Sequence, residues 1–174
     1  IAICDILGKQ EMKAKLLLAH THLLSAITSP SGIFDLKKDR SRFSMDWYYP
    51  ILSGVTEQNY INGLMQKVQE VFWVPGTGIK CVSDEPWVTV AETCECSIAF
   101  NKLGHKKFAN ELLLNAAAIV DNQNIPFMGW QLDEEIYWPD EQPSWTSGAL
   151  ILAADANNEL TKAANLFTSK QFIA

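Results

Sequence analysis

One stretch decides the fold of this chain: residues 76–96 read G-T-G-I-K-C-V-S-D-E-P-W-V-T-V-A-E-T-C-E-C. Proline keeps the residue before it out of helical geometry but is itself tolerated in a first helical turn, so we expect a helix to begin near Pro86. Asp84 or Glu85 would then cap or oppose the free N–H groups at its start. The stretch therefore predicts a glycine-containing loop that leads into a tryptophan-led helix.

The expected helix carries two carboxylates beside an apolar face. At helical spacing the side chains at 87, 91, 94 and 98 form one apolar stripe, while Glu92 and Glu95 lie about one turn apart on the neighbouring stripe. Carboxylates placed in this way either cap backbone and face solvent or line a cavity. The sequence alone leaves both interpretations open.

Composition limits the class of protein. The 174 residues are 48% hydrophobic, which is enough for a substantial core in one domain, 1–174. With 14 basic and 20 acidic residues the formal net charge is −6, so we expect no nucleic-acid partner. We expect no membrane span, because no apolar run approaches about 20 residues. Four cysteines without a dense disulfide pattern predict reduced thiols and a cytoplasmic location.

Most of the chain has helical periodicity. Helices are expected at about 5–27, after Ser44, after Thr56, at 105–121, at 145–155 and at 160–167, with at most short extended pieces at 78–82 and 135–138. A weak repeat supports this pattern: Gly32, Gly78 and Gly129 each precede an acidic loop and then a tryptophan-bearing helix, at Trp47, Trp87 and Trp145. We therefore predict an all-α fold of three helical hairpins, an incomplete α/α toroid with half of a six-hairpin ring.

Several segments resemble a known family in the same order along the chain. They are S-M-D-W-Y-Y-P at 44–50, V-P-G at 74–76, C-V-S-D at 81–84, P-W-V-T at 86–89, A-E-T-C-E at 91–95, W-P at 138–139 with Glu141, W-T at 145–146 and L-A-A-D-A at 152–156. They are similar to the C-terminal half of bacterial prenyltransferase-like proteins of the terpenoid cyclase and protein prenyltransferase superfamily. The resemblance implies a toroid domain, cut from a longer protein, with a candidate site in its central cavity. It implies a transferase without deciding whether the domain is catalytic.

Metal-dependent prenyl transfer is weakly supported. The thiols and carboxylates near the decisive stretch, Cys81, Asp84, Cys94 and Cys96, lack the spacing of a zinc site, so we predict no metal and no cofactor. Buried, inert thiols are the favoured interpretation of these cysteines. A terpenoid cyclase would instead use acids and aromatic walls, for which the acids at 133–141 and the tryptophans at 130, 138 and 145 are candidates. A solvated acidic loop pinned by aromatic residues is the favoured interpretation.

Carbohydrate chemistry is the alternative function. Glycosidases use two carboxylates that flank the sugar bond, and we name Asp46, Glu92 and Glu141 as catalytic candidates because each lies near the start of an expected inner helix. A helix cap for Asp46 and a salt bridge for Glu92 are the competing structural interpretations. A non-catalytic binding or scaffold domain is the third possibility.

Aromatic and polar side chains near these acids are candidates for binding a small molecule, either an isoprenoid or a carbohydrate. Aromatic clusters also pack protein cores, and isolated loop lysines are usually solvated, so each residue has a structural interpretation as well. The severed edge of a half ring would expose apolar helix faces and so predicts self-association. The candidate ligand-binding residues are Trp47, Tyr48, Tyr49, Lys80, Asp84, Trp87, Glu95, Trp138 and Trp145.

Overall fold

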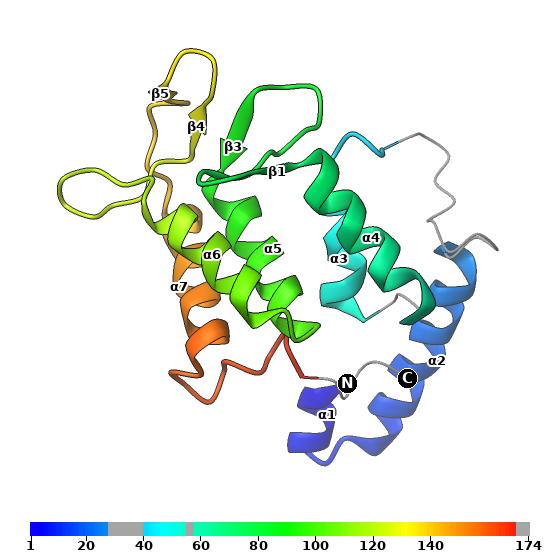
Figure 1. The fold of residues 1–174 in the computed structure, drawn as a ribbon. Coiled ribbons are helices and arrows are strands. Elements are labelled where there is room, and N and C mark those ends of the chain that lie inside the picture. Colours follow the sequence, from blue (N-terminus) through cyan, green and yellow to red (C-terminus); the bar gives the residue numbers. More distant parts are fainter. Residues whose placement is uncertain (28–39, 55–57, 170–174) are drawn as a thin grey trace. The chain divides into compact units, whose positions relative to one another are not determined.

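The computed structural model describes residues 1–27, 40–54 and 58–169, and the chain divides into two compact units, Ile1–Lys38 and Asp39–Ala174. The first unit holds α1 (Ala2–Ile6) and α2 (Gln10–Ile27) (Figure 1). Gly8 separates them with a left-handed φ of 64°, so the single helix expected at 5–27 is interrupted. The expected helix stop at 29–32, and with it Gly32 of the proposed repeat, lies outside the described residues.

The second unit contains the longer-range packing. Its helices are α3 (Met45–Ser53), α4 (Gln58–Val71), α5 (Val90–Lys102), α6 (Lys106–Ala117) and α7 (Ser144–Asn158). No helix in the described part of the chain is long and apolar enough to cross a bilayer. Helices at 45–53, 58–71, 106–117 and 144–158 agree with the periodicity of the sequence.

Two small antiparallel sheets show that the all-α prediction is wrong. One pairs β1 (Trp73–Val74) with β2 (Gly78–Ile79), and the other has the order β3 (Trp87–Thr89), β4 (Gly129–Gln131), β5 (Ile136–Tyr137). In the second sheet Val88 lies opposite Trp130, and Trp130 lies opposite Tyr137. The fold is therefore mixed α/β, with β-branched and aromatic residues forming the strands.

The incomplete toroid is corrected for the same reason. The segment after Pro86 pairs with β4 as a strand, so Trp87 does not lead a helix and α5 begins three residues later, at Val90. Residues 161–168 form turns instead of the expected last helix. The middle hairpin is formed by α5 and α6, but a strand and not a tryptophan-led helical turn precedes it. Self-association stays a prediction.

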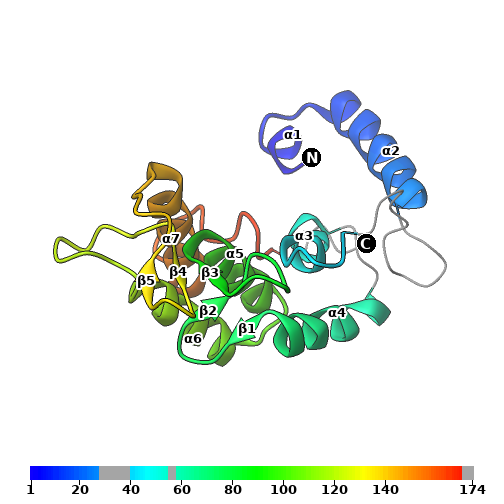
Figure 2. The same ribbon diagram turned by 90° about the horizontal axis from the view of Figure 1, so that it is seen from above.

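Helix α5 is the centre of the second unit. It packs against α3, α6 and α7, and both views place it between α3 and α7 (Figures 1 and 2). One core cluster joins α3, α4, α5 and α6 around Tyr48, Phe72 and Phe100. The other joins β3, α5, α6 and α7 around Val88 and Cys94. Because both cores share α5, polar groups on this helix are held in fixed positions.

Candidate functional site

A group of acidic and phenolic side chains lies where α3 faces α5. We call Asp46, Tyr48, Tyr49, Glu92 and Glu95 the carboxylate cluster. The Tyr48 hydroxyl, on a fully buried side chain, donates a hydrogen bond to Glu95 Oε2 at 3.1 Å. Glu92 and Glu95 are half-buried and lie three residues apart on α5, so their side chains are neighbours on the helix surface. The cluster therefore joins two helices of the core through polar contacts.

The loop at 80–83 adds a thiol to the cluster. Cys81 Sγ donates to Glu92 Oε1 at 3.5 Å. This loop is fixed to the start of α3 by backbone hydrogen bonds from Ser44 N to Cys81 O (3.0 Å) and from Ser83 N to Arg42 O (2.8 Å). The same contacts set the entry of the chain into α3, which carries both tyrosines. The two carboxylates thus contact groups from two separate segments.

Burial raises the pKa of Glu95 and of both tyrosines in the cluster. Burial, followed by the charge of Glu92, raises the pKa of Glu95, although hydrogen bonds from Tyr49 and Tyr48 lower it in part. Burial, followed by the charge of Glu95, also raises the pKa of both Tyr48 and Tyr49, so both hydroxyls remain donors at neutral pH. One carboxyl of the pair therefore holds its proton more tightly than an ordinary glutamate.

The Cys81 thiol is not prepared for nucleophilic chemistry. Burial, followed by the charge of Glu92, raises its pKa to about 12. Only the thiolate is a good nucleophile or metal ligand, so Cys81 serves as a neutral donor to Glu92. Across the described ranges 1–27, 40–54 and 58–169, no three His, Cys, Asp or Glu side chains are grouped as a metal site requires.

Asp46 lies at the edge of the cluster. Its carboxylate forms an ion pair with Arg40, with Nε to Oδ2 at 2.7 Å, and its charge contributes to the raised pKa of Tyr49. Ser44 holds the N-cap position of α3 but makes no side-chain capping hydrogen bond, so Asp46 is not the cap. Sequence reasoning missed Arg40 because its pairing with Asp46 depends on how the turn before α3 folds.

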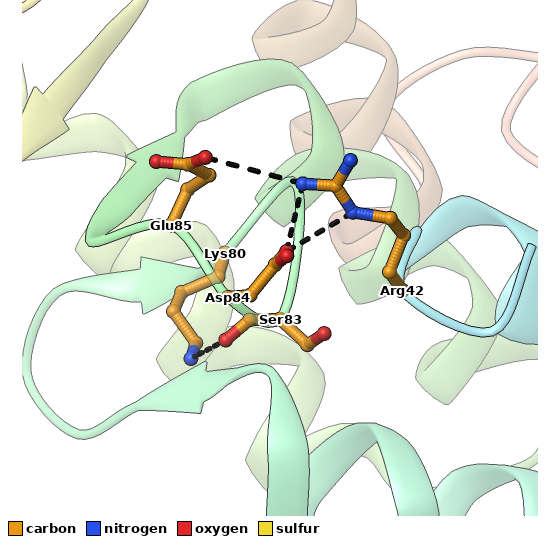
Figure 3. Close-up of polar contacts among 5 residues, drawn as sticks. All are labelled: Arg42, Lys80, Ser83, Asp84 and Glu85. Carbon is orange, nitrogen blue, oxygen red and sulfur yellow. Dashed lines mark hydrogen bonds and ion pairs between the residues drawn. The ribbon is translucent and has the colours of Figure 1, made fainter.

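Two other candidate ligands are engaged within the protein. Asp84 accepts hydrogen bonds from Arg42 Nε (3.0 Å) and Nη2 (2.9 Å), and Lys80 Nζ donates to Ser83 O at 2.7 Å (Figure 3). The hydrogen bond from Arg42 lowers the pKa of the exposed Asp84 carboxyl. Asp84 and Glu85 therefore face Arg42 instead of capping a helix, and Lys80 closes its own loop. Arg42 is 42 residues distant in sequence from Asp84, so no local pattern indicated it.

The candidate tryptophans and Glu141 take no part in the contacts of the carboxylate cluster. Trp47 donates its indole N–H to Ser41 O at 2.9 Å, and Trp87 donates to Trp138 O at 2.7 Å. Trp138, Trp145 and the Glu141 side chain are exposed; Trp145 lies on α7, and Trp138 and Glu141 lie in the segment between β5 and α7. The structure thus unites Asp46, Tyr48, Tyr49, Glu92 and Glu95 but leaves these other candidates elsewhere.

The raised pKa of Glu95 predicts a pH-dependent stability. The folded state binds the Glu95 proton more tightly than the unfolded state, so this contribution is complete below about pH 4.5 and is lost as the pH rises through the folded pKa. Glu95→Gln mimics the protonated side chain. It should therefore be more stable than the native protein at pH values above the folded pKa of Glu95, and not at pH values below the unfolded pKa. Thermal unfolding of the native protein, Glu95→Gln and the exposed control Glu70→Gln between pH 4 and pH 8 measures the difference. A Glu95→Gln difference independent of pH would contradict it.

Comparison with known proteins finds a similarity to a glycosidase and not to prenyltransferase-like proteins. No protein-family model matches the chain. The chain is 34% identical over 167 residues to an MMP endo-(1,4)-3-O-methyl-alpha-D-mannosidase from Mycolicibacterium hassiacum. The match covers 96% of this chain and 45% of the mannosidase, so the chain spans less than half the length of that relative. The resemblance to prenyltransferase-like proteins is therefore corrected: the likeness is to a glycosidase.

Proposed function

We propose that this chain carries carboxylates of a glycoside hydrolase that acts on α-(1→4)-linked mannosides with 3-O-methyl groups. The observation that carries the proposal is the pair Glu92 and Glu95, held half-buried against two tyrosine hydroxyls where α3 faces α5. The substrate class in this proposal comes from the name of the mannosidase to which the chain is similar. Glycosidases need two carboxyl groups, one of which acts as an acid, and the raised pKa of Glu95 suits it to that role.

Each carboxyl group has a distinct role in this proposal. Glu95, with its raised pKa, is the general acid that donates a proton to the glycosidic oxygen as the bond from that oxygen to C1 breaks. Glu92 is the carboxylate that acts at C1, either by activating a water molecule or by forming a glycosyl ester that water then cleaves. In both routes the water oxygen ends on C1 and the leaving sugar gains a proton.

The tyrosines and Asp46 support this chemistry in the same proposal. Tyr48 is fully buried and hydrogen-bonded to Glu95, so it fixes the direction in which the acid points. Tyr49 is partly exposed and also interacts with Glu95, which places a hydroxyl donor beside the reacting sugar. Asp46 is a third carboxylate, with its charge balanced by Arg40.

Incubation of the full-length protein with α-(1→4)-linked oligomers of 3-O-methyl-D-mannose tests the function. We expect shorter oligomers with new reducing ends, measured by mass spectrometry, with one ¹⁸O atom at C1 when the reaction runs in H₂¹⁸O. An α-(1→4)-linked glucose oligomer is the matched control and should remain intact. If neither the methylated oligomer nor its unmethylated mannose counterpart is cleaved, the proposal is wrong.

A further inference from the structure

We infer that the exposed side chains of Ile136 and Trp138, at the C-terminal end of β5, form a second saccharide-binding surface, separate in its contacts from the carboxylate cluster. This surface comprises Ile136 and Trp138, with 44% and 53% of their surfaces exposed, on either side of Tyr137, whose ring packs on Phe127; we call it the aromatic platform. Neighbouring exposed apolar side chains that are rimmed by polar residues are typical of ligand-binding surfaces. The ligand assignment rests on the proposed function, since an enzyme acting inside a polysaccharide must hold chain on both sides of the cleaved bond.

The platform is rigid before any ligand arrives. The Tyr137 ring stacks on Phe127 with centroids 3.9 Å apart and planes at 9°, and the edge of Trp130 contacts it at 5.1 Å. Stacking covers one face of the Tyr137 ring, while the residue as a whole stays more than a third exposed. This packing holds the strand from the side opposite Trp138, so little backbone entropy is lost when a ligand stacks on the Trp138 ring.

The backbone around Trp138 is held on both sides. Its N–H donates to Gly129 O at 3.1 Å, and its carbonyl accepts the indole N–H of Trp87 at 2.7 Å. These hydrogen bonds connect the Trp138 backbone to β4 and β3. They therefore fix the position from which the exposed indole extends. Trp138 is therefore presented to solvent by hydrogen bonds of its own sheet.

The charge around the platform selects the class of ligand. Exposed carboxylates at Asp133, Glu134 and Glu135 precede it in the chain, and Asp140 and Glu141 follow it. Carboxylates repel an anionic ligand but accept hydrogen bonds from hydroxyl groups. A neutral sugar offers both hydroxyl donors and an apolar C–H face, and each O-methyl group adds apolar surface for an aromatic ring. The platform thus fits a neutral, methylated oligosaccharide better than a phosphorylated or acidic one.

Binding and turnover measured separately test the platform. In Trp138→Ala we expect about a tenfold higher KM for long 3-O-methylmannose oligomers, equivalent to about 1.4 kcal/mol, with kcat unchanged. The KM for the shortest cleaved oligomer should not change, and Trp138→Phe should restore most of the affinity for long ones. Leu114→Ala, an exposed apolar residue on α6, is the matched control and should behave as the native protein.

Calorimetric titration separates failure of the platform from failure of the proposed function. If the native protein cleaves the oligomer and Trp138→Ala is indistinguishable from it in KM for every length, the platform is wrong while the function stands. If nothing is cleaved, a tenfold higher dissociation constant of Trp138→Ala for the oligomer, relative to the native protein, supports the platform but not the proposed function. Equal binding by the native protein and Trp138→Ala, or no binding by either, overturns it.

Discussion

Glu95→Gln is expected to lower kcat for 3-O-methylmannose oligomers by about 10²–10⁴-fold, the usual contribution of a general acid or base. Glutamine keeps the shape of the side chain and can still accept a hydrogen bond from Tyr48, but it cannot transfer a proton to the glycosidic oxygen. Glu92→Gln should cost a similar factor, because the amide can neither activate water nor attack C1. Initial rates over a range of oligomer concentrations measure both losses.

A change of leaving group distinguishes the two roles. An aryl mannoside with a good leaving group departs without protonation, so its hydrolysis should be largely restored in Glu95→Gln and not in Glu92→Gln. The basic limb of the pH–rate profile should also disappear in Glu95→Gln, since that limb reports deprotonation of the acid. Glu70→Gln, on the exposed side of α4, is the control and should keep native rates. Glu92→Gln and Glu95→Gln enzymes within twofold of native kcat would show that the reaction takes place elsewhere.

Helix positions could be predicted from the sequence because apolar periodicity and breakers are local signals. The helices at 58–71 and 144–158 begin and end close to the expected residues, and Ser44 marks the start of α3. The segment 87–89 could not be assigned in this way, since its state depends on pairing with Gly129–Gln131, about 40 residues further along the chain. A short W-V-T segment after proline is compatible with both helical and extended backbone. In this protein its pairing with β4 makes it a strand.

The candidate site shows the same division between local and distant information. Spacing along α5 predicted that Glu92 and Glu95 would lie side by side, and they do share one neighbourhood. The hydrogen bond from Tyr48 to Glu95 joins residues 47 positions apart and follows from the packing of α3 on α5. Burial, which sets the ionisation of Glu95, is a property of the assembled core and could not be obtained from spacing.

Gly129→Ala is expected to destabilise the fold by about 3 kcal/mol, within the range for overpacking a filled site. A Cβ atom at Gly129 would collide with the Val88 carbonyl oxygen and approach Trp87 Nε1 to 2.6 Å. The Val88 oxygen is backbone in the paired strand β3, and the Trp87 indole is held by its hydrogen bond to Trp138, so neither moves aside cheaply. The Tm should fall by about 6–12 °C in a domain of this size.

Gly148→Ala is the matched control for this substitution, because it makes the same chemical change on α7, where apart from the neighbouring residues and backbone of that helix no atom lies within 4 Å of the added carbon. Alanine is favoured over glycine inside a helix by about 1 kcal/mol, so the control should raise the Tm by about 2–4 °C. Opposite signs for one substitution at two glycines would locate the effect in the β3–β4 contact. Because Gly129 O also accepts the Trp138 N–H, Gly129→Ala should disturb the aromatic platform as well, seen as a change in tryptophan fluorescence that Gly148→Ala lacks. A Gly129→Ala protein as stable as the native one would show that β3 and β4 are not held as closely as their register implies.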